Sequence, residues 1–343
     1  MSQFLRAMTA EALRAMTPLR AGERKLGETI QTLPSGKPLE EGLRMLDAAS
    51  FAMVLVPEDI GVRANFGRAG AAHLAQAALR RLLAMQDNNM IRGRDMVVLG
   101  EVHVNDLMQQ AIGLDANRPA DWQKLSDLVI EVDTRVQSVV QAVVKTGHRV
   151  IVLGGGHENG WGILAGLHQG IGAPPSCVNL DAHADLRNDP HRHSGNAFSK
   201  AMEAGHLVRY AAIGLHEAYL NAHMAARIQK EDALHAITWD AIVRGAYSLE
   251  QACDTTISFS GRGPVALEVD LDVVAGMAAS ASSPTGMTAE QLRMCVHRLT
   301  KGLDTRSLHI CEGIPGEGDS SGAGKLAAVL VVDFIQAVQG KRA

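Results

Sequence analysis

The chain has 343 residues, a net charge of −4 at pH 7 and 46% hydrophobic residues. A chain of this length can bury a sizeable core in one large domain or in two. Its lysines and arginines are scattered rather than clustered, which argues against a nucleic-acid site or an anionic membrane surface as partner. Its four cysteines stand far apart without Cys-x-x-Cys spacing, so we interpret them as reduced thiols in the core.

The two ends of the chain give no sign of a targeting or membrane segment. Charged residues at Arg6, Glu11 and Arg14 interrupt the first stretch, so we expect no secretory signal and a cytoplasmic protein. The apolar stretch from Leu326 to Val338 contains Asp333 and is too short to span a bilayer. We expect a buried strand or helix there.

The predicted elements indicate an α/β fold. Residues 1–47 contain two helical stretches, 4–16 and 39–49, separated by the turn Pro34-Ser35-Gly36-Lys37-Pro38, and we predict a helical N-terminal extension. From Phe51 onward, apolar runs typical of buried parallel strands alternate with helical stretches, without a linker or repeat. Residues 48–343 are therefore predicted to form one three-layer αβα domain with a mostly parallel central sheet.

The expected positions of the individual elements follow from the same patterns. A loop is expected from Gly61 to Gly70, after the first strand of the domain. Helices are predicted at 71–85, 125–145, 161–169 and 325–339. Strands are predicted at 51–56, 95–100, 150–153, 177–180, 208–213, 256–260, 265–269 and 307–311.

Three clusters of histidine and aspartate each follow one of these apolar runs. They are Gly154-Gly155-Gly156-His157, Asp181-Ala182-His183-Ala184-Asp185 and Asp270-Leu271-Asp272. Alternate residues of an extended segment face the same side, and parallel strands end at one edge of a sheet, so we expect these side chains to converge. Two imidazoles and four carboxylates without a thiolate form a hard, oxygen-rich set that suits Mn²⁺ better than structural zinc.

A structural role without metal is the alternative for these clusters. Any one of them alone would more often be a surface pair or a helix cap than a metal site. Packing all of them together without a cation, however, would bring several carboxylates into a buried space where desolvation and mutual repulsion oppose their charge. We therefore predict a binuclear metal centre with a hydrolytic function.

With these residues in place, the chain resembles the ureohydrolase family of arginase, agmatinase and formimidoylglutamase from about Phe51 to Pro315. The resemblance implies an arginase-like fold, hydrolysis of carbon–nitrogen bonds in linear amidines, two Mn²⁺ ions per subunit and a small amidine or guanidino substrate. It also implies a homo-oligomer. The matching segments are 61–71, similar to the family's substrate loop, Gly155-Gly156-His157, Asp181-Ala182-His183-Ala184-Asp185 and Asp270-Leu271-Asp272.

The resemblance also implies roles for individual residues. The family pattern places His157 and Asp185 on one ion and His183 and Asp272 on the other, with Asp181 and Asp270 bridging them. Glu312 resembles the family glutamate that lies outside the metal shell and holds the positively charged group of the substrate. Glu312 and Asp185 are therefore the expected catalytic residues.

The segment after the second cluster resembles formimidoylglutamases more than arginases. The Gly-Gly-Gly-His-Glu sequence, the Leu186-Arg187 pair and a Ser-Gly-x-x-Phe segment are similar to that branch, and arginases place a histidine where Phe198 stands. N-formimino-L-glutamate carries two carboxylates, which require cationic donors, and Arg187 is suited to bidentate pairing. The candidate substrate-binding residues are Arg187, Asn65, Arg68, Ser194, Gly195 and Asn196, with Arg63 as an alternative to Arg68.

We therefore expect a formimidoylglutamase of histidine degradation, which converts N-formimino-L-glutamate and water to L-glutamate and formamide. Two alternatives stay open: a guanidino hydrolase of agmatinase or guanidinobutyrase type that releases urea, and a non-catalytic family member with an assembly role. Glu268 departs from the family pattern, which usually has serine or threonine there. By strand alternation it shares a face with Asp270, so it is a further ligand, a partner of a ligand, or a substrate contact. His191 and His193 are expected in a solvated loop.

Overall fold

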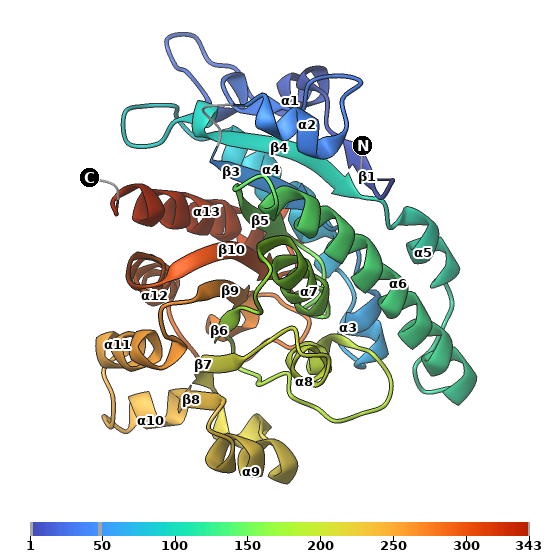
Figure 1. Cartoon of the computed structure of the whole chain (residues 1–343), viewed down its shortest axis with the longest axis vertical. Coiled ribbons are helices and arrows are strands. Elements are labelled where there is room, and N and C mark those ends of the chain that lie inside the picture. The colour runs from blue at the N-terminus through green and yellow to red at the C-terminus, as the bar shows by residue number, and fades with distance from the viewer. Residues whose placement is uncertain (1–2, 47–49, 342–343) are drawn as a thin grey trace.

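A ten-stranded sheet runs through the molecule in the computed structural model, which describes residues 3–46 and 50–341 (Figure 1). The strand order is β1-β4-β3-β5-β10-β9-β6-β7-β8, and β2 also pairs with β4. Every ladder between these strands is parallel except β1 with β4. The predicted α/β fold with a mostly parallel sheet is confirmed.

The central strands are almost completely buried, as expected where helices cover both faces of a parallel sheet. They are β3 (Phe51–Leu55), β5 (Arg149–Leu153), β10 (Asp304–Cys311), β9 (Pro264–Asp270) and β6 (Ser176–Leu180). The outer strands are β1 (Leu5–Ala7), β2 (Gln31–Thr32), β4 (Met96–Val102), β7 (Arg209–Leu215) and β8 (Leu234–Thr238).

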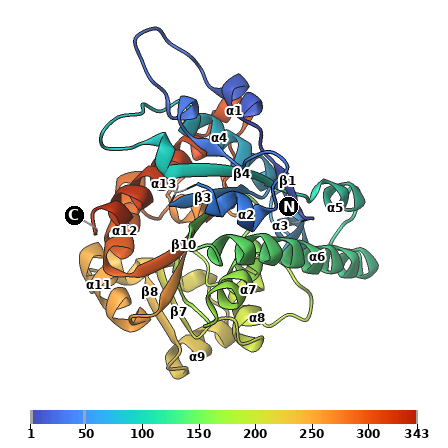
Figure 2. The same ribbon diagram turned by 45° about the horizontal axis from the view of Figure 1, so that its top comes forward.

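Two hydrophobic clusters lie on opposite faces of this sheet and make the three layers (Figure 2). Within β3, Phe51 and Met53 belong to one cluster, while Ala52 and Val54 belong to the other, as strand alternation requires. The first cluster includes α4 (Leu74–Leu83), α11 (Leu249–Ser260), α12 (Ala289–Gly302) and α13 (Ala323–Gln339). The second includes α6 (Pro119–Val144), α7 (Asn159–Ile171) and α8 (Ala197–Glu203).

The N-terminal segment differs from its prediction. The helix expected over 4–16 begins only at Ala10, as α1 (Ala10–Met16), because Leu5–Ala7 pairs with β4 as the edge strand β1. The segment is therefore not purely helical, since β1 and β2 extend the sheet through pairing that overrides local helix propensity. The second expected helix is α2 (Leu39–Arg44), and residues 47–49 lie outside the described part of the chain. A domain boundary at residue 47 stays a prediction.

The strand predicted over 256–260 is wrong, because these residues form the end of α11. Their β-branched and aromatic side chains favoured a strand. The helix instead begins with a capping box at Ser248 and Gln251, and hydroxyls at Thr255, Ser258 and Ser260 donate to the carbonyls four residues earlier at 2.8–3.0 Å. The expected loop over 61–70 begins within a short helix, α3 (Ile60–Ala64).

The helix predicted over 125–145 is α6, which begins six residues earlier, at Pro119. The other predicted elements are present within a few residues of their expected bounds. The apolar stretch from Leu326 to Val338 is part of α13, packed on the sheet. Among the described residues, no helix is both long and apolar enough to cross a membrane.

Helices α6 and α7 pack closely, and this contact sets the position of the turn that precedes α7. A Cβ at Gly166 would lie 2.7 Å from the Cβ of Val140 and 2.9 Å from the carbonyl oxygen of Gln137. Only hydrogen fits there, so the glycine allows the two helices to approach.

We expect Gly166→Ala to destabilise the fold by about 1 to 3 kcal/mol, because the added methyl overpacks this contact. Urea denaturation followed by circular dichroism measures the free energy of unfolding. Gly263→Ala is the matched control, since a Cβ there meets no atom within 4 Å. An equal free energy of unfolding for wild type and Gly166→Ala would contradict the packing argument.

Candidate metal centre

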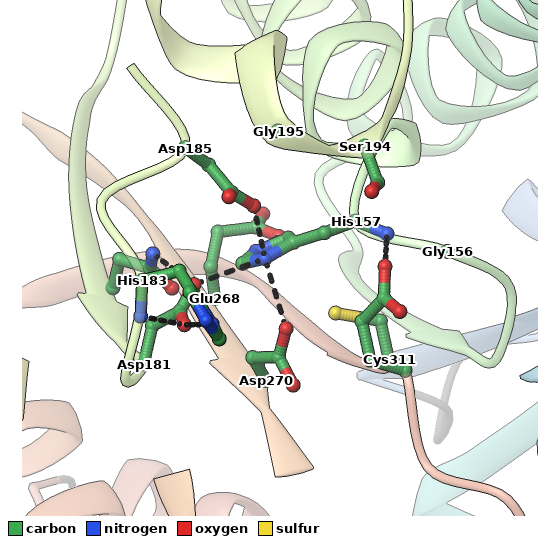
Figure 3. A network of polar contacts seen from close by, with 12 residues as sticks. Gly156, His157, Asp181, His183, Asp185, Ser194, Gly195, Glu268, Asp270 and Cys311 are labelled. Carbon is green, nitrogen blue, oxygen red and sulfur yellow. Dashed lines mark hydrogen bonds and ion pairs between the residues drawn. The ribbon is translucent and has the colours of Figure 1, made fainter. Parts of the chain in front are cut away.

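Four neighbouring strands bring the predicted side chains to one edge of the sheet (Figure 3). His157 follows β5, Asp181 follows β6, Asp270 ends β9, and Glu312 follows β10. The ladders align these ends: Cys311 pairs with Asp270, and Leu180 with Val269. Parallel pairing therefore converts three separate sequence clusters into one site.

His157 reaches the site through a glycine turn. Gly154 and Gly155 have φ values of 86° and 79°, a conformation that favours glycine. The imidazole of His157 is fully buried, and neither ring nitrogen has a hydrogen-bond partner. Its Nδ1 lies 3.0 Å from Asp185 Oδ2, 3.2 Å from Asp181 Oδ2 and 3.5 Å from Asp270 Oδ2. A buried, unpartnered nitrogen that faces three carboxylates has the environment of a cation ligand.

His183 forms the second half of the site. Its Nδ1 lies 2.8 Å from Asp272 Oδ2 and 3.7 Å from Asp181 Oδ1. Asp181 thus directs one oxygen toward each imidazole. Among the described residues, three groups have ligand atoms within 4.8 Å of one another, and two of them share Asp181: His157 with Asp181 and Asp185, and Asp181 with His183 and Asp272.

Burial and mutual repulsion raise the pKa of two carboxylates at this edge of the sheet. Burial and the carboxylate of Asp181 raise the pKa of Asp272 to about 6. Burial, with Asp272 and Asp181 nearby, raises the pKa of Asp270 well above its usual value. Burial would lower the pKa of His183, but Asp272 outweighs it and raises that pKa to about 10. Bound divalent cations would stabilise the ionised carboxylates, so the residues present fit a pair of Mn²⁺ ions.

Glu312 lies beside these residues with one free oxygen. Its Oε1 accepts the backbone N–H of His157 at 2.6 Å, while its Oε2 has no partner. Burial raises the pKa of Glu312 to about 7. Glu312 and Asp185 are non-glycine residues at positive φ, 63° and 48°, a conformation that concentrates at functional sites.

A cavity of about 210 Å³ opens onto the site. Among the predicted substrate residues, Arg187, Asn65, Ser194 and Gly195 line it. Asn196 and Arg68 do not line this cavity. The Asn196 Oδ1 instead accepts a bond from Arg192, and the guanidinium of Arg68 donates to the carbonyl oxygen of Ala279 at 3.3 Å. Arg63 likewise donates to a carbonyl, that of Ala111.

The loop that carries Arg187 is anchored by a buried ion pair that the sequence did not reveal. Arg192 is 6% exposed, and its guanidinium donates to both oxygens of Asp133 in α6 at 2.9 and 3.0 Å. It also donates to Asn196 Oδ1 and to the carbonyls of His193 and Glu158. The two partners lie 59 positions apart, so no local pattern could relate them.

His191 and His193 lie in a loop, as predicted, but the prediction that the loop is solvated is wrong for His193, and His191 is half-buried. His193 is 2% exposed and accepts the N–H of Gly195 at Nδ1, which caps the turn. The ring of His191 stacks on Trp122 with a centroid distance of 3.9 Å. Tyr219, which the sequence analysis also missed, lines the cavity and stacks on His183 at 5.0 Å. An isolated tyrosine carries no distinguishing sequence signal.

Comparison with known proteins agrees with this architecture. The Arginase family model matches residues 49–336. The chain belongs to the arginase family. It is accordingly a hydrolase of carbon–nitrogen bonds in linear amidines, and the resemblance drawn from the sequence is confirmed. A formimidoylglutamase of Corynebacterium efficiens is 30% identical over 265 residues, which cover 76% of this chain and 73% of that one.

Solved structures give the same fold. The formimidoylglutamase of Bacillus subtilis has a TM-score of 0.74 at 14% identity, covering 95% of this chain and 96% of that one. Trypanosoma cruzi formiminoglutamase, crystallised with two Mn²⁺, has a TM-score of 0.70 at 17% identity, covering 92% and 98%. At this level of identity the likeness concerns the fold alone.

We expect Asp181→Ala to abolish turnover and to reduce bound Mn²⁺ sharply, because one carboxylate faces both imidazoles. Elemental analysis after dialysis measures the metal content, and Asp181→Asn tests the charge without changing the shape. Asp232→Ala, at an exposed aspartate, is the control. Full activity with full metal content in Asp181→Ala would contradict the prediction that Asp181 serves both metal sites.

We expect Arg192→Lys to lower kcat/KM by about 10- to 100-fold with metal content unchanged, because lysine cannot pair bidentately and the cavity wall shifts. Steady-state kinetics and elemental analysis measure the two quantities. Arg293→Lys is the control: this arginine also pairs bidentately, with Asp333 at 2.8 and 3.0 Å, but its own side chain is about half exposed and it lies outside the cavity lining. Metal loss together with activity loss in Arg192→Lys would contradict a role confined to the loop.

Proposed function

We propose that the chain is a manganese-dependent formimidoylglutamase, which hydrolyses N-formimino-L-glutamate to L-glutamate and formamide in histidine degradation. The observation that carries this proposal is the position of Arg187. It lines the same cavity as His183, Asp272 and Glu312, and its guanidinium pairs with no acidic side chain among the described residues. A free cation at the rim of an otherwise acidic cavity suits a substrate whose tail is anionic.

The cavity lining offers a group for each charged part of this substrate. The formimino group carries positive charge, and the free Oε2 of Glu312 can accept its N–H donors. The glutamate carboxylates can pair with Arg187, which lines the same cavity. Asn65 donates to Ser194 Oγ at 3.2 Å, which joins the two segments that carry the polar lining. This opposed pair of charges would orient the reacting carbon toward the metal-facing carboxylates.

In this proposal six side chains would hold two Mn²⁺ ions: His157 and Asp185 would hold one, His183 and Asp272 the other, and Asp181 and Asp270 would be shared. Bound Mn²⁺ would lower the pKa of the attacking water and polarise the amidine. Glu312 and Asp185 are the proposed catalytic residues. Glu312 would bind the amidine nitrogens, and Asp185, two residues before Arg187, would hold the first ion beside His157.

Phe198 supports this branch of the family over arginase. Its ring is buried and lies edge-on to the imidazole of His157 at a centroid distance of 5.1 Å. Phe198 can pack against the ligand but cannot exchange a proton. The place where arginases carry a histidine therefore contributes only apolar contact here.

A substrate panel tests the proposed function directly. We expect formamide from N-formimino-L-glutamate with Mn²⁺, and a kcat/KM at least about 100-fold lower for arginine, agmatine and guanidinobutyrate, whose urea is measured in parallel. Urea from any guanidino compound without formamide from formimino-glutamate would overturn the substrate assignment. Absence of both products in protein that has bound manganese would indicate a non-catalytic member.

We expect Arg187→Met to lower kcat/KM for N-formimino-L-glutamate by about 10- to 100-fold, because a charge-assisted hydrogen bond contributes roughly 1.5–3 kcal/mol. Metal content should not change. Arg262→Met, at an exposed arginine before the amino end of β9, is the matched control. An unchanged KM and kcat in Arg187→Met would show that another residue binds the carboxylates.

A further inference from the structure

Glu268 lies in β9, two residues before Asp270, and is fully buried. It does not line the cavity, so it is not a substrate contact. Its Oε2 lies 2.6 Å from His309 Nδ1 and 3.7 Å from His157 Nε2. It belongs to neither of the two groups that share Asp181. Of the three roles left open by the sequence, partner of a ligand is the one that these distances support.

His309 connects Glu268 to the turn that carries His157. The two residues are directly paired in the ladder between β10 and β9, and both are fully buried. The other ring nitrogen of His309, Nε2, lies 3.2 Å from the carbonyl oxygen of Gly154. His309 therefore contacts the carboxylate that faces the ring of His157 and also the backbone from which His157 emerges.

The two ring nitrogens of His157 have different environments, as the labelled side chains in Figure 3 show. Its Nδ1 faces Asp181, Asp185 and Asp270, whereas its Nε2 faces Glu268. A histidine that binds a cation through Nδ1 must carry its proton on Nε2. A carboxylate next to Nε2 favours that tautomer and makes the unprotonated Nδ1 a stronger metal ligand.

We propose that Glu268 and His309 form a buried positioning pair for His157, in which the Glu268 carboxylate faces Nε2 at 3.7 Å and keeps Nδ1 directed toward the first metal site. This inference rests on the proposed metal centre. It gives a role to a carboxylate at position 268, where the family usually has serine or threonine. Glu268 acts through His157 and not on the substrate.

A second role for these residues is a softer metal site on the far side of His157. The ligand atoms of His157, His309 and Cys311 also lie within 4.8 Å of one another. Both nitrogens of His309 already have partners, however, and the thiol of Cys311 donates to the carbonyl of Val269 at 3.6 Å. These contacts would have to break before the group could bind an ion, so the positioning role accounts for the arrangement better.

Glu268→Gln tests the pair, because glutamine keeps the shape and removes the charge. Calorimetric titration of metal-free full-length protein with Mn²⁺, without substrate, measures the affinity of each site. We expect one site with wild-type affinity and one weakened by about 10- to 100-fold. Electron paramagnetic resonance is recorded between one and two equivalents of Mn²⁺. The Glu268→Gln protein should show the signal of a single Mn²⁺ ion, where the wild type shows the signal of two coupled ions.

The control is Ser307→Ala, which changes a buried side chain on the same face of β10 whose hydroxyl has no partner. It should bind Mn²⁺ as the wild type does. Two wild-type affinities in Glu268→Gln would overturn the inference, and so would equal weakening of both sites in folded protein. A wild-type protein that binds no Mn²⁺ at all would instead contradict the proposed function.

A second pair of variants keeps the inference testable if Glu268→Gln does not fold. In His309→Asn the amide N–H can replace the Nδ1–H donor to Glu268, while His309→Leu has no donor. We expect the asparagine variant to retain the first site within about 10-fold of wild type and the leucine variant to weaken it further. Equal affinities in the two variants would overturn the role of His309.

Discussion

Like charges buried at one edge of a parallel sheet are the constraint on which this structure depends. The carboxylates of Asp181, Asp185, Asp270 and Asp272 surround two imidazoles, and the strand ladders hold them there. Without cations this arrangement is opposed by desolvation and repulsion, which is why the pKa of Asp270 and of Asp272 is raised. Only the folded chain brings these residues together, so metal binding and fold stability are coupled.

Two buried side-chain pairs lie around the metal-facing residues. They hold the surrounding loop and strands in position and do not contact the substrate cavity. Arg192 and Asp133 tie the loop before α8 to α6, and Glu268 and His309 connect two central strands beneath His157. Arg192 also donates to backbone carbonyls and His309 also contacts one, so the position of each depends on the fold and not on a single side-chain partner. Such pairs restrict geometry more than they add stability, because their desolvation offsets much of their attraction.

The fold and the centre follow from the sequence where the signal is local. Continuous apolar runs such as 51–56 and 265–269 indicate buried parallel strands, and a histidine or aspartate directly after such a run indicates the sheet edge. Signals that depend on distant partners are absent from the sequence. The strand β1 forms because the outer side of β4 is free to pair with it. The pairing of Arg192 with Asp133 joins segments that are distant in the sequence. The end of α11 is helical although its side chains favour strands.

The proposed metal ligands lie nearer the strand ends than the proposed contacts to the substrate tail do. The ligands are on a strand of fixed register or within about five residues of its end. Arg187 and Ser194 lie farther along, on a loop that is held to the helices by Arg192, by the stacking of His191 on Trp122 and by the bond from Ser199. A Cβ at Gly195 in this loop would lie 2.9 Å from Nδ2 of Asn65 and 3.1 Å from Cδ of Arg187. A side chain there would therefore displace two residues of the cavity lining. A change in this loop would alter the charge presented to the substrate tail while leaving the metal-facing edge of the sheet intact.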